Sequence, residues 1–129
     1  MTRSRLQTFV SRYLAPAAIA LLLANQALAQ AGPPSVRVDG AWQTTWAGGR
    51  AVLELTQKGA VVTGRYTGSN DGEVKGTLAG NVLTGDWIGA ANERGGFALT
   101  FHADGKTFTG TWGMDASKTD GGPWTGQRK

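Results

Sequence analysis

The sequence contains no cysteine, so disulfide bonds and thiolate metal sites are excluded. Its single histidine, His102, has no second imidazole or thiolate with which to complete a metal site, and it offers a nucleophile no well-placed base. Carboxylate pairs remain conceivable. However, we expect Glu54 and Asp86 to face outward, and Asp115 and Asp120 fall in a loop without the spacing of a calcium site. We therefore expect no metal, no cofactor and no enzymatic activity.

Long hydrophobic runs are also missing. The longest apolar stretch, residues 15–24, is shorter than the roughly 20 residues needed to span a bilayer. Three arginines precede it and an Ala-x-Ala site at 27–29 follows it, which is the pattern of a secretory signal peptide. We predict that residues 1–29 form this signal, with cleavage after Ala29, or after Ala31 as the second choice. The mature protein is then periplasmic or secreted and has no membrane span, and an uncleaved anchor is the weaker alternative.

Clustered positive charge is absent from the rest of the chain. The sequence has 13 Lys and Arg against 9 Asp and Glu, and three of the basic residues lie in the predicted signal. The remaining net charge is close to zero, so nucleic-acid binding has no support. Residues 30–129 are long enough for one domain with a modest core. Without a disulfide or a metal, that domain depends on a well-closed hydrophobic interior.

No helical periodicity is found after Val36. Apolar residues alternate at period two and are interrupted by turn-forming pairs such as Lys58-Gly59, Gly80-Asn81 and Asp104-Gly105. We predict strands over eight segments: 36–46, 50–57, 60–67, 73–79, 81–88, 95–102, 106–113 and 123–128. The predicted fold is all-β, an eight-stranded antiparallel up-and-down meander closed into a barrel, over 36–129 after an extended lead-in at 30–35. A β-sandwich is the alternative.

A five-residue pattern recurs six times within these strands. It has glycine at its centre and a large side chain two residues to either side, as in Phe-Thr-Gly-Thr-Trp at 108–112. The other copies are VDGAW (38–42), VTGRY (62–66), VKGTL (74–78), LTGDW (83–87) and WTGQR (124–128). Because alternation places all three key positions on the inward face, the glycines let the strands curl into a narrow barrel. They open space in its middle layer. That space is either a cavity or is refilled by aromatic rings, and we favour refilling slightly.

Strand direction predicts where the aromatic residues gather. In a meander all odd strands run the same way, so residues after their central glycines share one end of the barrel, as do residues before the centres of even strands. The longer connections, among them 68–72, 89–94 and 114–122, fall at that same end. We predict a ligand site there, since small barrels bind ligands in their mouths. Its predicted residues are Trp42, Tyr66, Trp87, Trp112, Trp124 and Phe97, with Trp46 nearer the rim.

Part of the chain resembles a known family. The segments GAW at 40–42 and LELTQKGAVVTGRY at 53–66 are similar to the opening three strands of avidins and streptavidin, which are meander barrels that bind biotin. The resemblance covers mainly residues 38–67, and the architecture is shared with lipocalins. It implies that Tyr66 matches a tyrosine that hydrogen-bonds the ligand. Thr44 and Gly48 depart from the family's small polar ligand contacts, so biotin itself is not predicted.

Two functions follow from these features. The first is an exported, non-enzymatic binding module that holds a small hydrophobic or aromatic ligand at the aromatic end. The second is a protein-interaction module, either a protease inhibitor or a structural barrel of the cell envelope, that contacts a protein partner through loops 68–72 and 114–122 with Trp46 as an anchor.

Overall fold

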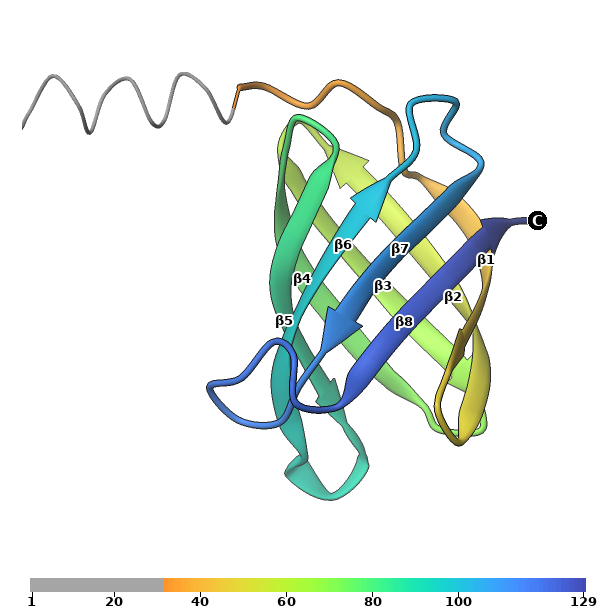
Figure 1. Ribbon diagram of the computed structural model, residues 1–129, viewed down its shortest axis with the longest axis vertical. Helices are drawn as coiled ribbons and strands as arrows, with labels where there is room; N and C mark the ends of the chain where they lie inside the picture. Colours follow the sequence, from red (N-terminus) through yellow and green to blue (C-terminus); the bar gives the residue numbers. More distant parts are fainter. Residues whose placement is uncertain (1–31) are drawn as a thin grey trace, which may run out of the picture. The chain divides into compact units, whose positions relative to one another are not determined.

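The computed structural model describes residues 32–129; residues 1–31, which contain the predicted signal peptide, lie outside the described part. Eight antiparallel strands close into a barrel in the order in which they occur along the chain (Figure 1). They are β1 (Gly40–Trp46), β2 (Gly49–Lys58), β3 (Val61–Gly68), β4 (Gly72–Ala79), β5 (Val82–Gly89), β6 (Arg94–Phe101), β7 (Thr107–Trp112) and β8 (Gly122–Arg128). Strand β1 pairs with both β2 and β8, so the sheet has no free edge. The predicted up-and-down barrel is confirmed, and the alternative sandwich is wrong.

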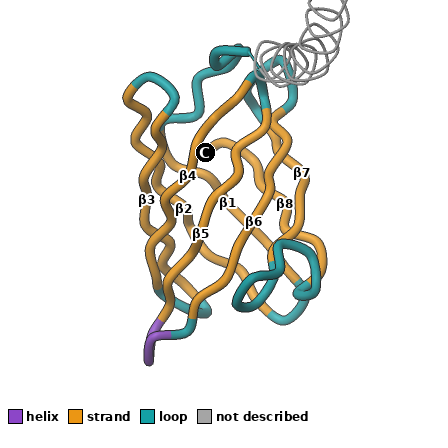
Figure 2. Tube along the Cα trace, turned by 90° about the vertical axis from the view of Figure 1, so that its left-hand side faces the viewer, coloured by secondary structure: helices purple, strands orange, loops and turns teal. Residues whose placement is uncertain are grey.

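The two ends of the barrel differ in their connections. The loops 47–48, 69–71, 90–93 and 113–121 lie at the lower end in Figure 1, and this end is called the loop end below. Figure 2 shows the short helix at Ala90–Asn92 at this same end. The turns 59–60, 80–81 and 102–106 lie at the opposite end, called the closed end. Among the described residues, no helix has the length and apolar character needed to cross a membrane.

The alternation of the sequence accounts for the core. In β2, the side chains of Leu53, Leu55 and Gln57 are buried, while Glu54 and Thr56 between them are exposed. The same period-two burial runs through the other strands, and nearly all of the large side chains that flank the motif glycines are buried. One face of every strand therefore fills the barrel, and the other face meets solvent.

The space above the motif glycines is occupied. The ring of Phe108 lies so close to Gly126 that a Cβ atom there would come within 2.5 Å of the Phe108 Cζ. The Leu55 Cδ2 would lie 2.7 Å from a Cβ at Gly64. Phe108 is 1% exposed, and Leu55 belongs to the same buried cluster. The middle of the barrel is thus filled by side chains that pack onto glycine. Of the two alternatives predicted from the sequence, a cavity or a refilled interior, the structure shows the refilled interior.

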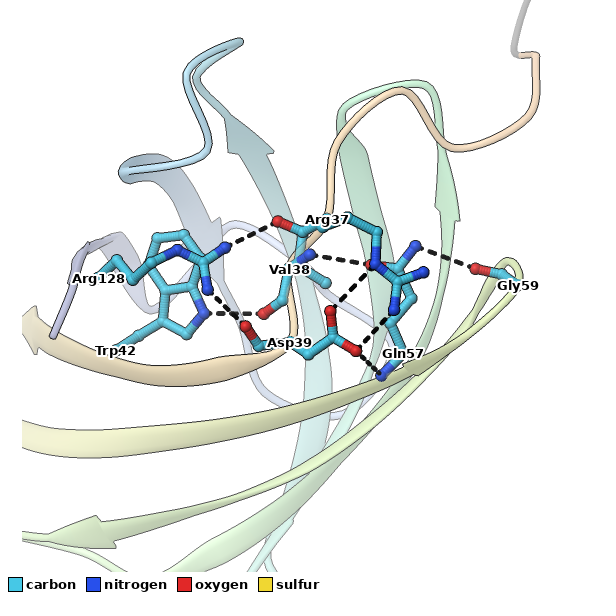
Figure 3. Close-up of polar contacts among 7 residues, drawn as sticks. All are labelled: Arg37, Val38, Asp39, Trp42, Gln57, Gly59 and Arg128. Atoms are coloured by element: carbon cyan, nitrogen blue, oxygen red, sulfur yellow. Dashed lines mark hydrogen bonds and ion pairs between the residues drawn. The ribbon is translucent and has the colours of Figure 1, made fainter.

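The closed end is sealed by the segment before β1, which the sequence analysis wrongly counted as strand from residue 36. Val38 is fully buried there, and its N–H donates to the Gln57 Oε1 (2.9 Å), while the Gln57 Nε2 donates to the Gly59 carbonyl (3.1 Å) (Figure 3). The Val38 carbonyl accepts a hydrogen bond from the Trp42 indole (2.9 Å). These bonds satisfy the backbone where it crosses the barrel end, so β1 begins only at Gly40.

Candidate functional site

An open pocket of about 170 Å³ lies at the loop end of the barrel. Five of the seven predicted site residues line it: Trp46, Tyr66, Trp87, Trp112 and Trp124. The loops and strand ends between them add Asn70, Asp71, Gly89, Ala90, Glu93 and Met114. The structure therefore brings most of the predicted aromatic residues together around an accessible space, and their role in ligand binding stays a prediction.

Trp42 lies elsewhere, and its predicted placement at the aromatic end is wrong. Its ring packs against Phe101 and Phe108 at centroid distances of 5.1 and 5.6 Å, and its indole reaches back to the Val38 carbonyl at the closed end. The reason is the tilt of strands in a closed barrel, which shifts each paired residue along the axis relative to its partner. Residues that follow the motif glycine by two places in different strands consequently lie at different heights along the barrel axis.

Phe97 also does not line the pocket. It is 1% exposed and packs edge-on against Trp124 at a centroid distance of 5.9 Å. Its contribution is to hold Trp124 in place from within the core.

Trp124 connects the pocket wall to the core. Its ring makes edge-on contacts with Tyr66 (6.4 Å between centroids) and Trp46 (6.5 Å) on the pocket side. It makes similar contacts with Phe97 and with Phe108 (6.2 Å) in the interior. Edge-to-face pairs of this kind fix the orientation of both rings. The pocket wall is therefore continuous with the packed core.

A second pair of rings, Trp87 and Trp112, forms another part of the wall. Their centroids are 5.8 Å apart and their planes cross at 73°. The Trp87 Nε1 donates to the carbonyl of Gly113 (2.9 Å), the first residue of loop 113–121. Trp112 lies against Gly121 at the other end of that loop, where a Cβ atom would come within 2.6 Å of the ring. Both ends of the loop are thereby held against the wall of the pocket.

Unused hydrogen-bonding capacity is found on this wall. Within residues 32–129, the two buried side-chain polar atoms without a hydrogen-bond partner are the Nε1 atoms of Trp112 and Trp124. Both residues line the pocket. An unpaired buried donor costs about 1–3 kcal/mol, and such groups are uncommon in native structures. Both N–H groups are buried within the packed rings, so the wall keeps two unpaired donors that cost stability.

The polar side of the pocket is acidic. Asp71 and Glu93 line it together with Tyr66, and no lysine or arginine is among its lining residues. Burial raises the pKa of the Tyr66 hydroxyl above its ordinary value, and the negative charges of Glu93 and Asp71 raise it further. Tyr66 is therefore a neutral hydrogen-bonding phenol over the physiological pH range.

The loop-borne members of the site were not predicted from the sequence; they are Asn70, Asp71, Ala90, Glu93 and Met114. Loop residues show no periodicity that would assign them to a face. The signal that could have found them is their position, since loops 68–72 and 89–94 were both placed at the aromatic end.

The remaining titratable candidate, His102, lies away from this pocket, in the 102–106 connection at the closed end. Its Nδ1 is 3.4 Å from the Asp104 Oδ1, and the two side chains are 69% and 50% exposed. His102 is therefore an exposed residue at the turn that follows β6.

The chain was compared with protein-family models, curated protein sequences and solved structures. No family model, no curated protein and no solved structure matches it. The geometry of the pocket is therefore the basis for inferring a function.

Proposed function

We propose that this protein is a non-enzymatic binding module that holds a small molecule in the aromatic pocket at its loop end. The observation that carries this proposal is the convergence of five aromatic side chains, from five different strands or strand ends, around one open space. Concave sites with apolar walls and a few polar groups are the usual form of small-molecule sites. We also propose that residues 1–29 direct export, so that binding takes place in the periplasm or outside the cell.

The size of the pocket limits the ligand. A cavity of about 150 Å³ holds a molecule as large as benzene. With about 170 Å³, this pocket fits a ligand, or the end of a larger ligand, equivalent to one ring. Aromatic side chains dominate the wall, which favours a ligand with a compact apolar part.

The resemblance of residues 38–67 to avidins agrees with a site of this kind. The closed eight-stranded barrel is compatible with an avidin-like or lipocalin-like architecture. Tyr66, which matches the ligand-binding tyrosine of that family, lines the pocket. We propose that Tyr66 likewise contacts the ligand, without extending the likeness to biotin.

Intrinsic tryptophan fluorescence combined with thermal unfolding tests the proposal. Small ring compounds should shift the emission of the wall tryptophans and raise the melting temperature by mass action. The variant Trp112→Ala should lose both responses. Ile88→Ala is the control, because Ile88 precedes Gly89 in the chain but is 51% exposed and does not line the pocket. Equal responses in the two variants would contradict the proposal.

The protein-interaction alternative is tested by variants away from the wall. Trp46 is unsuited to that purpose, because it lines the pocket and packs against Trp124. Lys118→Ala and Thr119→Ala change exposed residues of the 114–122 loop that are not on the wall. A partner that docks on the loops should respond to these two changes, whereas a pocket ligand should not.

A further inference from the structure

The pocket combines an aromatic wall with two carboxylates. Asp71 lies in the loop between β3 and β4, and Glu93 follows the short helix at Ala90–Asn92. These loops come from neighbouring parts of the barrel, since β4 pairs with both β3 and β5. The order of the strands thus places the two acidic side chains on the same side of the pocket.

Neither carboxylate is neutralised within the described part of the chain. The ion pairs found in residues 32–129 join Arg37 with Asp39, Arg65 with Glu73 and His102 with Asp104. The Asp71 Oδ1 accepts a hydrogen bond from the Gly68 N–H (3.1 Å), which orders the loop but leaves the charge in place. Arg94 follows Glu93 in the sequence, but it is exposed and does not line the pocket.

The electric field of these carboxylates reaches the wall. Burial is the largest cause of the raised pKa of Tyr66, and the charges of Glu93 and then Asp71 add to it. A negative potential that disfavours a phenolate at this position favours a positive charge in the same space. The faces of the surrounding indole and phenol rings carry partial negative charge and attract cations in the same way.

We propose that the pocket selects an organic cation with a compact, weakly hydrated head group, such as a quaternary ammonium. This inference rests on the proposed function and names the chemical class of its ligand. The head group would lie among Trp46, Tyr66, Trp87, Trp112 and Trp124, with Asp71 and Glu93 beside it. A trimethylammonium group is close to benzene in size, which suits the volume of about 170 Å³. Aromatic cages of this composition recognise such cations in general.

The test compares choline with 3,3-dimethyl-1-butanol, an uncharged molecule of the same shape with carbon in place of the nitrogen. Tryptophan fluorescence titrations at low salt give the dissociation constant of each. Choline should bind at least about tenfold more tightly, because only the cation gains from the rings and the carboxylates. The difference should shrink as salt is added.

A double variant, Asp71→Asn with Glu93→Gln, removes both pocket charges and keeps the shape of the side chains. Its affinity for choline should fall about fivefold or more, while its affinity for the alcohol should not change. Glu54→Gln with Asp86→Asn is the matched control, since it removes two charges from exposed strand positions that do not line the pocket. The control should bind both compounds as the unmodified protein does, and its melting temperature should report any general effect on folding.

The failures can be told apart. Equal binding of choline and the alcohol, or a double variant indistinguishable from its control, would overturn the selection of cations and leave the pocket as a binding site. If neither compound, nor a neutral ring compound such as phenol or indole, binds at millimolar concentration, the proposed function falls together with this inference.

Discussion

The guanidinium of Arg128 lies over the ring of Trp42, with its central carbon 4.4 Å from the ring centroid. The Arg128 Nε donates to the Gly105 carbonyl and its Nη2 to the Arg37 carbonyl, both at 2.8 Å, and its Nη1 donates to the Asp39 carbonyl. One residue from the last strand thereby ties together the segment before β1, the first strand and the turn after β6. The closed end is thus built for stability, whereas the loop end leaves donors unpaired.

Replacing Arg128 tests this division of roles. Arg128→Met should lower the free energy of unfolding by about 2–4 kcal/mol, because three charge-assisted hydrogen bonds and the stacking on Trp42 are lost. Arg128→Lys should recover only part of this, since an ammonium cannot reproduce the planar fork. Urea unfolding measures both values. A loss below about 0.5 kcal/mol in Arg128→Met would contradict the account, as would weaker ligand binding by the folded variant.

Adding one methyl group at Gly126 should strain the core. The Cβ would meet the ring of Phe108, which cannot easily move because it also packs against Phe101 and Trp124. Gly126→Ala should therefore cost about 1–3 kcal/mol. Gln127→Ala, at the neighbouring exposed position, should stay within about 0.5 kcal/mol of the unmodified protein. Equal stability of the two variants would show that Phe108 does not rest on this glycine.

The two tryptophans of the Trp87–Trp112 pair should respond differently to the same change. Trp87→Phe removes a bonded indole N–H and leaves the Gly113 carbonyl without that donor, so it should cost about 1–2 kcal/mol more than Trp112→Phe, which removes an unpaired one. Amide hydrogen exchange should also speed up in loop 113–121 of Trp87→Phe only. Identical losses of unfolding free energy in the two variants would mean that the hydrogen bond from Trp87 to the Gly113 carbonyl does not hold the loop.

Stability should depend on the ionisation of Tyr66 in alkaline solution. Because the pKa of Tyr66 is higher in the folded than in the unfolded chain, the folded state holds this proton more tightly. Its contribution to stability is complete below about pH 10, the ordinary pKa of tyrosine, and is lost as the pH rises through the folded value. Urea unfolding between pH 8 and 11.5 should show this loss in the unmodified protein and a shallower one in Tyr66→Phe.

The same pKa can be observed directly. Tyr66 is the single tyrosine of residues 30–129, so the absorbance of its phenolate at alkaline pH reports one group. The double variant Asp71→Asn with Glu93→Gln should titrate at a lower pH than the unmodified protein, though still above the ordinary value because burial remains. An unchanged titration would show that the two carboxylates do not act on the pocket.

The sequence predicted the barrel and most of the pocket wall because both depend on period-two alternation and strand direction. Tyr66, Trp87 and Trp112 follow glycine in strands whose ends were correctly placed at the loop end. Trp42 has the same local pattern, but the stagger between tilted strands moves it to the closed end, and no short pattern encodes that stagger. The contact of Arg128 with Trp42 joins the first and last strands, which are far apart in the sequence, so no local sequence pattern indicates it.

The acidic side of the pocket could not be predicted for a different reason. Asp71 and Glu93 sit in loops, where side-chain direction follows from turn geometry and tertiary contacts instead of from alternation. The sequence placed their loops at the aromatic end, but the convergence of two charges on one hydroxyl emerges only from the folded chain.

Native mass spectrometry tests the central claim, a ligand in the aromatic pocket, most directly. The protein would be purified from its own host, exposed to the low-molecular-weight compounds of that host and measured without washing. The control is Ala90→Phe, which places a ring at an exposed position on the pocket wall. The account predicts a discrete added mass that leaves on denaturation and is absent from Ala90→Phe. A bare chain mass in the unmodified protein, or the same added mass in both, would contradict it.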